Sequence, residues 1–174
     1  MVKKKLKAVE AKKLLKLDLG CGKNPKQGFV GVDALDFGQD VKADLRKRWP
    51  WNDGSVEEVH CSHFLEHLTQ DERVHFFNEL DRVLVKGGKA TIATPHWLSE
   101  RAYGDPTHKM PPVVFFSYYY LNEEWRKVNA PHTGYQCNLE STGGNVIGAP
   151  WNARNQETPL SNPLRDSMWR RSTR

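Results

Sequence analysis

The stretch Leu14-Leu15-Lys16-Leu17-Asp18-Leu19-Gly20-Cys21-Gly22-Lys23-Asn24-Pro25 decides the fold of this chain of 174 residues. A short apolar run that ends in an acidic residue and two spaced glycines is typical of a β-strand leading into a ligand-binding turn. Gly20 and Gly22 lack a Cβ, so the backbone here can take a positive φ and approach a ligand closely. The pattern therefore predicts a strand over residues 14–19 and a binding turn after it, with the carboxylate of Asp18 beside the turn.

A second β-prone run, Phe29-Val30-Gly31-Val32-Asp33, also ends in a carboxylate. A carboxylate at the C-terminal edge of a strand can accept hydrogen bonds from both ribose hydroxyls. In nicotinamide-binding folds that carboxylate follows the glycines by about 20 residues, with a third glycine and a full helix between them. Here Asp33 comes sooner, and Asn24 occupies the place of the third glycine. The spacing therefore disfavours a dinucleotide-binding fold.

Further strands are expected over residues 40–45, 56–61 and 89–94. A helix is expected from residue 69 onward, because Thr69-Gln70-Asp71-Glu72 is a capping box. The apolar residues of this helix share one face, which predicts packing against the sheet; they are Val74, Phe77, Leu80, Val83 and Leu84. The helix is expected to end at Gly87-Gly88.

The residues Leu-Asp-Leu-Gly-Cys-Gly at positions 17–22 closely resemble the first motif of class I S-adenosylmethionine-dependent methyltransferases, of the type 11-like kind. The stretch 62–68 after the fourth strand and the glycine turn at 84–88 resemble the same family. The resemblance extends from about residue 14 to 94. It implies an α/β fold with a doubly wound, mostly parallel Rossmann-like sheet. It also implies the cofactor S-adenosyl-L-methionine and a transferase activity that methylates an acceptor.

The same resemblance implies which residues bind the cofactor. The glycine turn would wrap the methionine part, with Asp18 holding its amino end, while Asp33 would bind the ribose and Asp44 the adenine amino group. The cofactor-binding residues expected on this basis are Asp18, Gly20, Cys21, Gly22, Asp33, Asp44, Leu45, Ser62 and His63.

An alternative from another class comes from His63-Phe64-Leu65-Glu66-His67, which satisfies the inverted zinc-peptidase motif His-x-x-Glu-His. On a helix, His63 and His67 would share a face and could ligate zinc, with Glu66 as general base. Such peptidases need a further downstream ligand, for which only Glu140 offers itself, and they need a much larger fold. We therefore expect no metal among the site residues.

The acceptor site is expected in the polar loop 96–109, where aromatic faces lie beside groups able to bind or deprotonate an acceptor: His96, Trp97, Asp105 and His108. The sequence leaves the catalytic residues unassigned. It lacks the residues that methylate exocyclic amino groups of DNA bases, and Cys61 follows His60 rather than a proline. The expected acceptor is a small molecule or an exposed polar group on a larger one. The basic termini leave room for a phosphate-bearing acceptor. A cofactor-binding protein without transfer activity remains the second hypothesis.

Length and composition predict a single α/β domain. With the resemblance, this becomes a methyltransferase domain over residues 1–148, followed by a poorly ordered basic tail over 149–174. The net charge of +5 comes mostly from the two ends. Only residues 132–140 and 145–147 can be nominated for a last strand hairpin, so the sequence leaves open whether the sheet is complete. Three scattered cysteines predict reduced thiols. Without an apolar run of about 20 residues or the apolar core of a signal peptide, the expected location is cytoplasmic, with no membrane partner.

Overall fold

The computed structural model describes residues 13–141 and 167–171 of the chain. Its centre is a seven-stranded sheet with the order β3-β2-β1-β4-β5-β7-β6. The strands are β1 Leu15–Leu19, β2 Val30–Asp33, β3 Val41–Lys42, β4 Val56–Ser62, β5 Leu84–Ala93, β6 Leu139–Ser141 and β7 Ser167–Arg171. The five strands predicted between residues 14 and 94 are all present, with shifted ends.

The strands β1 to β5 pair in parallel, and only β7 runs antiparallel to its neighbours β5 and β6. The order reverses at β1, because the chain moves outward through β2 and β3 and then returns to β4 on the other side. In doubly wound sheets a ligand lies outside the carboxyl ends of the strands at such a switch point. The predicted fold class is confirmed, and the switch point locates the expected ligand crevice between β1 and β4.

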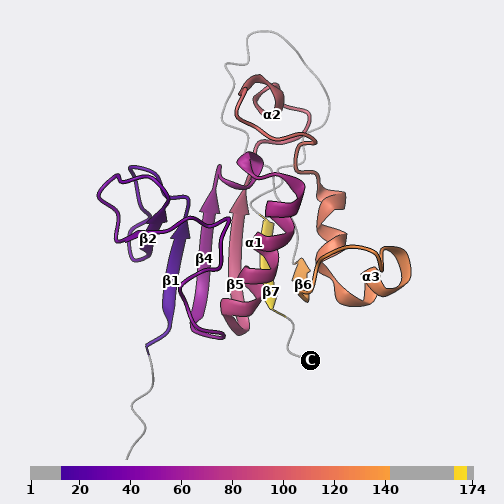
Figure 1. Cartoon of the computed structure of the whole chain (residues 1–174), viewed down its shortest axis with the longest axis horizontal. Coiled ribbons are helices and arrows are strands. Elements are labelled where there is room, and N and C mark those ends of the chain that lie inside the picture. The colour runs from indigo at the N-terminus through magenta and orange to yellow at the C-terminus, as the bar shows by residue number, and fades with distance from the viewer. Residues whose placement is uncertain (1–12, 142–166, 172–174) are drawn as a thin grey trace, which may run out of the picture.

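One long helix, α1 Gln70–Val83, connects β4 to β5 and lies in front of the sheet, over β5, in Figure 1. It begins with the predicted capping box, in which Thr69 accepts from the backbone of Glu72 and the Glu72 side chain accepts from the backbone of Thr69. The helix ends earlier than predicted. Leu84 is already extended, fully buried and paired with Val56, so strand pairing takes over before the glycines are reached.

The other helical elements are short: α2 Arg101–Gly104, α3 Glu123–Asn129 and the 3₁₀ turns η1 Leu65–His67 and η2 Phe115–Leu121. In Figure 1, α2 lies beyond the arrowheads of β4 and β5, above the carboxyl edge of the sheet. Among the described residues, the links from β1 to β2 and from β3 to β4 contain no helix.

An aromatic cluster under α1 supports this edge of the sheet. Phe76 is fully buried, and its ring centroid lies 5.3 Å from that of Trp49 and 6.1 Å from that of Phe64. Phe76 lies outside the predicted apolar face, while Val74 of that face is only half-buried. Because Phe64 follows β4 directly, Phe76 connects the core to the start of the functional site.

The last hairpin consists of β6 and β7. The register pairs Leu139 with Arg171 and, on the other side of β7, Lys89 with Arg170. β7 lies within the segment expected to be a poorly ordered tail, so the boundary at residue 148 does not hold for 167–171. The local sequence has little β signal. One edge of the long β5 pairs with β4, and the backbone N–H and C=O groups of its other edge need a partner. β7, from far along the chain, pairs with that edge. The nominated strand at 145–147 and the rest of the tail lie outside the described residues.

Within the described residues, none of the helices has the length and apolar character of a membrane span. Cys21, Cys61 and Cys137 are all free thiols, as the sequence predicts.

We predict that Phe76→Ala lowers the free energy of unfolding by about 3–5 kcal/mol, because it removes a fully buried ring from the core. Phe116→Ala is the matched control, since that side chain is 57% exposed. Urea denaturation followed by circular dichroism measures both. Equal losses in the two variants would contradict the packing described for Phe76.

Candidate functional site

The glycine turn follows β1 at the switch point. Gly20 and Gly22 have φ values of 69° and 56°, as the sequence predicts for this turn. The backbone N–H groups of Gly20 and Cys21 both donate to the carbonyl of Val32, which fastens the turn to β2. A Cβ on Gly20 would lie 2.6 Å from Cδ2 of Phe64, whereas a Cβ on Gly22 would meet no atom within 4 Å. Gly20 is therefore needed for packing, and Gly22 leaves open space for a ligand.

Asp18 is buried, and both of its carboxylate oxygens have partners. Oδ1 lies 2.6 Å from Nδ1 of His60 on β4, and Oδ2 accepts a hydrogen bond of 2.7 Å from the backbone N–H of Lys26. The side chain is only 5% exposed. Asp18 thus links β1, β4 and the loop after the glycine turn, and this arrangement suits a residue that positions the loop.

Asp33 ends β2 next to the glycine turn. Its carboxylate accepts hydrogen bonds of 3.0 Å from the backbone N–H groups of Gly22 and Leu35. A carboxylate has about four lone-pair sites, so capacity remains for a ligand hydroxyl. The structure thus brings together Gly22 and Asp33, which are separated in sequence.

Asp44 and Leu45 follow β3, farther along the same edge. The Asp44 carboxylate accepts two hydrogen bonds from the Arg46 guanidinium, at 2.9 and 3.1 Å, and these hydrogen bonds lower the pKa of Asp44. Leu45 is buried, and its carbonyl accepts from the indole N–H of Trp49. The Leu45 side chain therefore belongs to the core, and a ligand here would meet backbone atoms and Asp44.

Cys21 lies in the turn itself, where its Sγ donates to the carbonyl of Gly22. Burial raises the pKa of the Cys21 thiol, and the carboxylates of Asp18 and Asp33 raise it further. The thiol therefore stays protonated at neutral pH, which makes it a poor nucleophile.

Ser62 and His63 lie where β4 ends, on the other side of the switch point. His63 has a φ of 54°, uncommon for a residue other than glycine, and its backbone N–H donates to the carbonyl of Ala93. Its Nδ1 lies 3.0 Å from Oε1 of Glu66. Because the helical turn begins only at Leu65, His63 and His67 do not share a helical face. The zinc-peptidase hypothesis requires both histidines on one face of a helix, and the structure does not form that arrangement.

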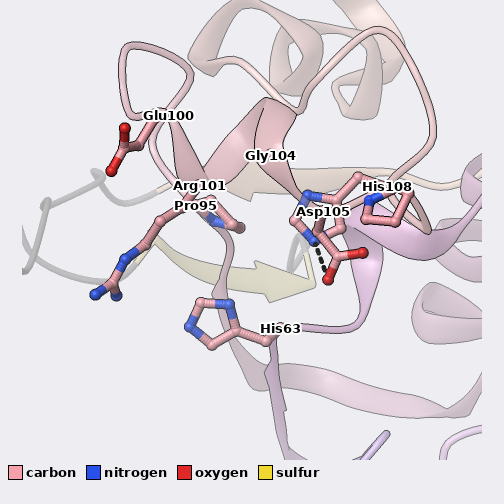
Figure 2. Close-up of a pocket in the computed structure, with 8 residues that line it drawn as sticks. His63, Pro95, Glu100, Arg101, Gly104, Asp105 and His108 are labelled. Atoms are coloured by element: carbon pink, nitrogen blue, oxygen red, sulfur yellow. Dashed lines mark ion pairs between the residues drawn. The ribbon is translucent and has the colours of Figure 1, made fainter.

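A cavity of about 660 Å³ adjoins His63 beyond the carboxyl ends of β4 and β5. Figure 2 shows His63 on one side and Asp105 and His108 on the other, with α2 forming a third wall. The complete lining is His63, Pro95, Glu100, Arg101, Gly104, Asp105, Pro106 and His108. Of the four residues predicted for the acceptor site, Asp105 and His108 line this cavity.

His96 and Trp97 do not line the cavity. The His96 imidazole accepts from the backbone N–H of Leu98 and lies beside the Trp97 ring, which is 44% exposed. Sequence reasoning missed Glu100 and Arg101, which are charged residues in the same predicted loop. They lie at the start of α2, Glu100 as the residue before the helix, and both line the cavity; a four-residue helix gives no periodic signal.

Asp105 is held by its own loop. Its Oδ1 accepts from the backbone N–H and the hydroxyl of Thr107, at 2.8 and 2.6 Å, and these bonds lower the pKa of Asp105. Oδ2 lies 3.8 Å from Nε2 of His108. The cavity therefore presents a carboxylate that stays ionised at neutral pH.

We predict that Gly20→Ala costs more stability than Gly22→Ala. Both positions have positive φ, which costs a non-glycine residue about 1–2 kcal/mol, but only the Cβ at residue 20 collides with Phe64. Chemical denaturation measures the difference. The double variant Gly20→Ala/Phe64→Ala should recover only the part due to the ring, because Cβ of residue 64 remains and lies 2.8 Å from the added Cβ. Equal costs for the two single variants would contradict this packing.

The comparisons with known proteins agree with the fold. Residues 24–92 match the family described as "Methyltransferase domain". A SAM dependent methyltransferase from Archaeoglobus fulgidus has the same fold, with a TM-score of 0.58 and 18% identity over 91% of this chain and 86% of that one. No curated protein has a significantly similar sequence.

Two further structures match a smaller part of the chain. A Pyrococcus horikoshii protein is 26% identical over 49% of this chain and 51% of its own, with a TM-score of 0.40. An S-adenosylmethionine dependent methyltransferase from Mesorhizobium loti is 20% identical over 45% of both chains, with a TM-score of 0.37. The match over residues 24–92 supports S-adenosyl-L-methionine as the cofactor and methyl transfer as the activity. The family match and the fold together confirm the resemblance that the glycine turn predicts, to the class I S-adenosylmethionine-dependent methyltransferases.

Proposed function

We propose that this protein transfers the methyl group of S-adenosyl-L-methionine to a small molecule, or to an exposed polar group, bound in the cavity lined by His63, Arg101 and Asp105. The observation that carries the proposal is the placement of the open glycine turn. It lies at the carboxyl end of β1, and the cavity lies beyond the carboxyl end of the adjacent β4. A cofactor on the turn and an acceptor in the cavity would meet across the switch point.

In this proposal, six of the nine predicted cofactor residues have roles that fit their surroundings. Gly22 lets the methionine part approach the backbone, because nothing occupies its open side. Asp33 binds the ribose with its remaining lone pairs. Asp18 positions the loop through Lys26 rather than binding the cofactor directly. Asp44 meets the adenine amino group, and Ser62 and His63 face the reacting end.

The reaction is a displacement at carbon. A lone pair of the acceptor forms the new bond to the methyl carbon as the carbon–sulfur bond breaks, and the sulfonium becomes a neutral thioether. The protein has to hold two reactants in line and exclude water, and such positioning can lower a barrier by about 7–11 kcal/mol. An acceptor that carries a proton needs a base, and Asp105 is an ionised carboxylate in the cavity wall. We leave the base unassigned.

The charges in the cavity favour a polar acceptor. Arg101 begins α2 and Glu100 directly precedes it, while Asp105 and His108 come from the loop after the helix. Arg101 offers a fork of N–H donors that fits a phosphate or carboxylate group. The sequence suggested a phosphate-bearing acceptor because the two termini are basic. In the structure, Arg101 gives a second reason for such an acceptor, because it lines the cavity.

We also propose a cytoplasmic location. The free thiols Cys21, Cys61 and Cys137 suit a reducing compartment, because none of them forms a disulfide.

We predict that calorimetry shows binding of S-adenosyl-L-methionine or its demethylated product, and that Asp33→Ala weakens it by about 10–150-fold. This range corresponds to the loss of one hydrogen bond to a charged group, about 1.5–3 kcal/mol. Asp36→Ala is the matched control, because that carboxylate is 77% exposed and makes only long contacts, a 3.4 Å hydrogen bond from the backbone N–H of Gly38 and a 4.0 Å contact with Lys42. Undiminished affinity in Asp33→Ala would refute the ribose role.

We predict that Arg101→Ala and Asp105→Ala lower kcat/KM for the acceptor by about 10–150-fold, since each removes a charged hydrogen-bonding group. The affinity for the cofactor should stay unchanged. An acceptor screen with methyl-labelled cofactor identifies the substrate for this measurement. His75→Ala is the control, because its ring binds the carbonyl of Lys47 and does not line the cavity. Cofactor binding with no transfer to any acceptor would favour the alternative of a binding protein without transferase activity.

A further inference from the structure

We propose that Glu66, His67 and His108 bind a divalent transition metal ion, with zinc as the best match, beside the cavity. One ligand atom from each side chain lies within 4.8 Å of the other two. Two of these residues come from η1 and the third from the loop after α2, so the cluster exists only in the folded chain. The binding of the ion does not depend on the proposed methyl transfer.

Glu66 gives the first observation. Its side chain is 5% exposed. Its Oε1 has His63 as a partner, but Oε2 is buried without a hydrogen-bond partner among the described residues. A buried polar atom left without a partner costs about 1–3 kcal/mol, and more when it is charged. A cation bound to Oε2 would remove this cost.

The nearby cation Arg73 does not satisfy Glu66. All three of its recorded hydrogen bonds go to backbone carbonyls, those of Leu65, Lys109 and Pro111. Together with the bond from Lys109 N–H to the carbonyl of Glu66, they fasten the loop of His108 to η1. Arg73 therefore fixes the positions of the ligands and leaves the carboxylate oxygen open.

The hydrogen bonds of His67 fix its tautomer. The hydroxyl oxygen of Thr107 lies 2.6 Å from Oδ1 of Asp105, which can only accept a hydrogen bond. The single hydroxyl proton of Thr107 is therefore donated to Asp105. The Thr107 oxygen must then accept from Nδ1 of His67, 3.0 Å away. In the neutral imidazole this leaves Nε2 of His67 with a free lone pair. A chain from carboxylate through hydroxyl to histidine is the kind of outer support that orients metal-binding histidines.

His108 is arranged in the same way. Its Nδ1 lies 3.3 Å from the carbonyl of Ala102, which only accepts, so Nδ1 carries the proton. In the neutral imidazole Nε2 then keeps its lone pair, with Oδ2 of Asp105 3.8 Å away. The ring is 4.8 Å from that of His67, centroid to centroid, and 9% exposed. In these tautomers each imidazole offers a lone pair at Nε2, and one ligand atom of each ring lies within 4.8 Å of a carboxylate oxygen of Glu66.

The ligand set indicates the metal. Two imidazoles and one carboxylate suit zinc and related transition ions, whereas magnesium and calcium prefer oxygen ligands alone. Zinc ligands at about 2.0–2.2 Å lie roughly 3.5 Å apart, so binding requires side-chain movements of about 1 Å. Three protein ligands leave a fourth position, and His108 also lines the cavity. A bound ion could there polarise an acceptor oxygen or lower the pKa of its hydroxyl.

This site differs from the one that the zinc-peptidase motif suggested, because His108 replaces His63 and Glu66 becomes a ligand instead of a base. It also departs from the expectation of no metal, which considered only ligands that are close in sequence and Glu140.

The test uses the full-length protein without an affinity tag. Competition with a chromophoric chelator measures zinc affinity, and elemental analysis measures stoichiometry. We expect one zinc ion per chain. Glu66→Gln, His67→Ala and His108→Ala should each weaken zinc binding more than Thr107→Val, which removes only the supporting hydroxyl and should cost about 10–100-fold.

Cobalt gives an independent readout, because its visible absorption reports a low-symmetry site with nitrogen and oxygen ligands and should disappear in His108→Ala. His75→Ala is the matched control and should bind like the wild type. Circular dichroism of the metal-free variants shows that each one folds, and Glu66→Gln keeps the shape of the side chain. Absence of stoichiometric zinc from the wild type, or equal affinity in wild type, Glu66→Gln and His108→Ala, would overturn the proposal.

Discussion

The contact between Phe64 and the backbone of Gly20 is the constraint on which the site depends. A Cβ at residue 20 would stand 2.6 Å from the Phe64 ring, so only glycine lets β1 and the residues after β4 come this close. Phe64 in turn packs on the buried Phe76 of α1. The helix, the end of β4 and the glycine turn are thereby held as one rigid unit, which gives a preorganised surface to a ligand.

Buried polar groups complete this unit. Asp18 joins β4 to the loop after the glycine turn, and Arg73 joins η1 to the loop that carries His108. Each makes hydrogen bonds to backbone or imidazole groups that would otherwise be unsatisfied inside the protein. Their value to function is therefore positional: one fixes the proposed cofactor side and the other fixes the cavity side.

The two sides suggest a division of tasks. The turn with Gly22 and Asp33 offers open space and lone pairs for a cofactor, while Arg101 and Asp105 give the cavity groups that can hold a polar acceptor. A metal ion at Glu66, His67 and His108 would add a positive charge beside the cavity. Such a charge is most useful where an acceptor must lose a proton before it attacks.

The sequence by itself determined the five strands between residues 14 and 94, the capping box at Thr69 and the glycine turn, because each depends on neighbours within a few residues, while the parallel order of the strands followed from the family resemblance. It also predicted Asp33 at the end of β2, and Asp105 and His108 within the loop that lines the cavity. Only the tertiary structure decided that His96 and Trp97 lie outside the cavity and that Leu84 belongs to a strand. It also decided that residues 167–171 complete the sheet and that His108 meets Glu66. These outcomes depend on contacts between residues far apart in the chain, which local propensity and periodicity do not encode.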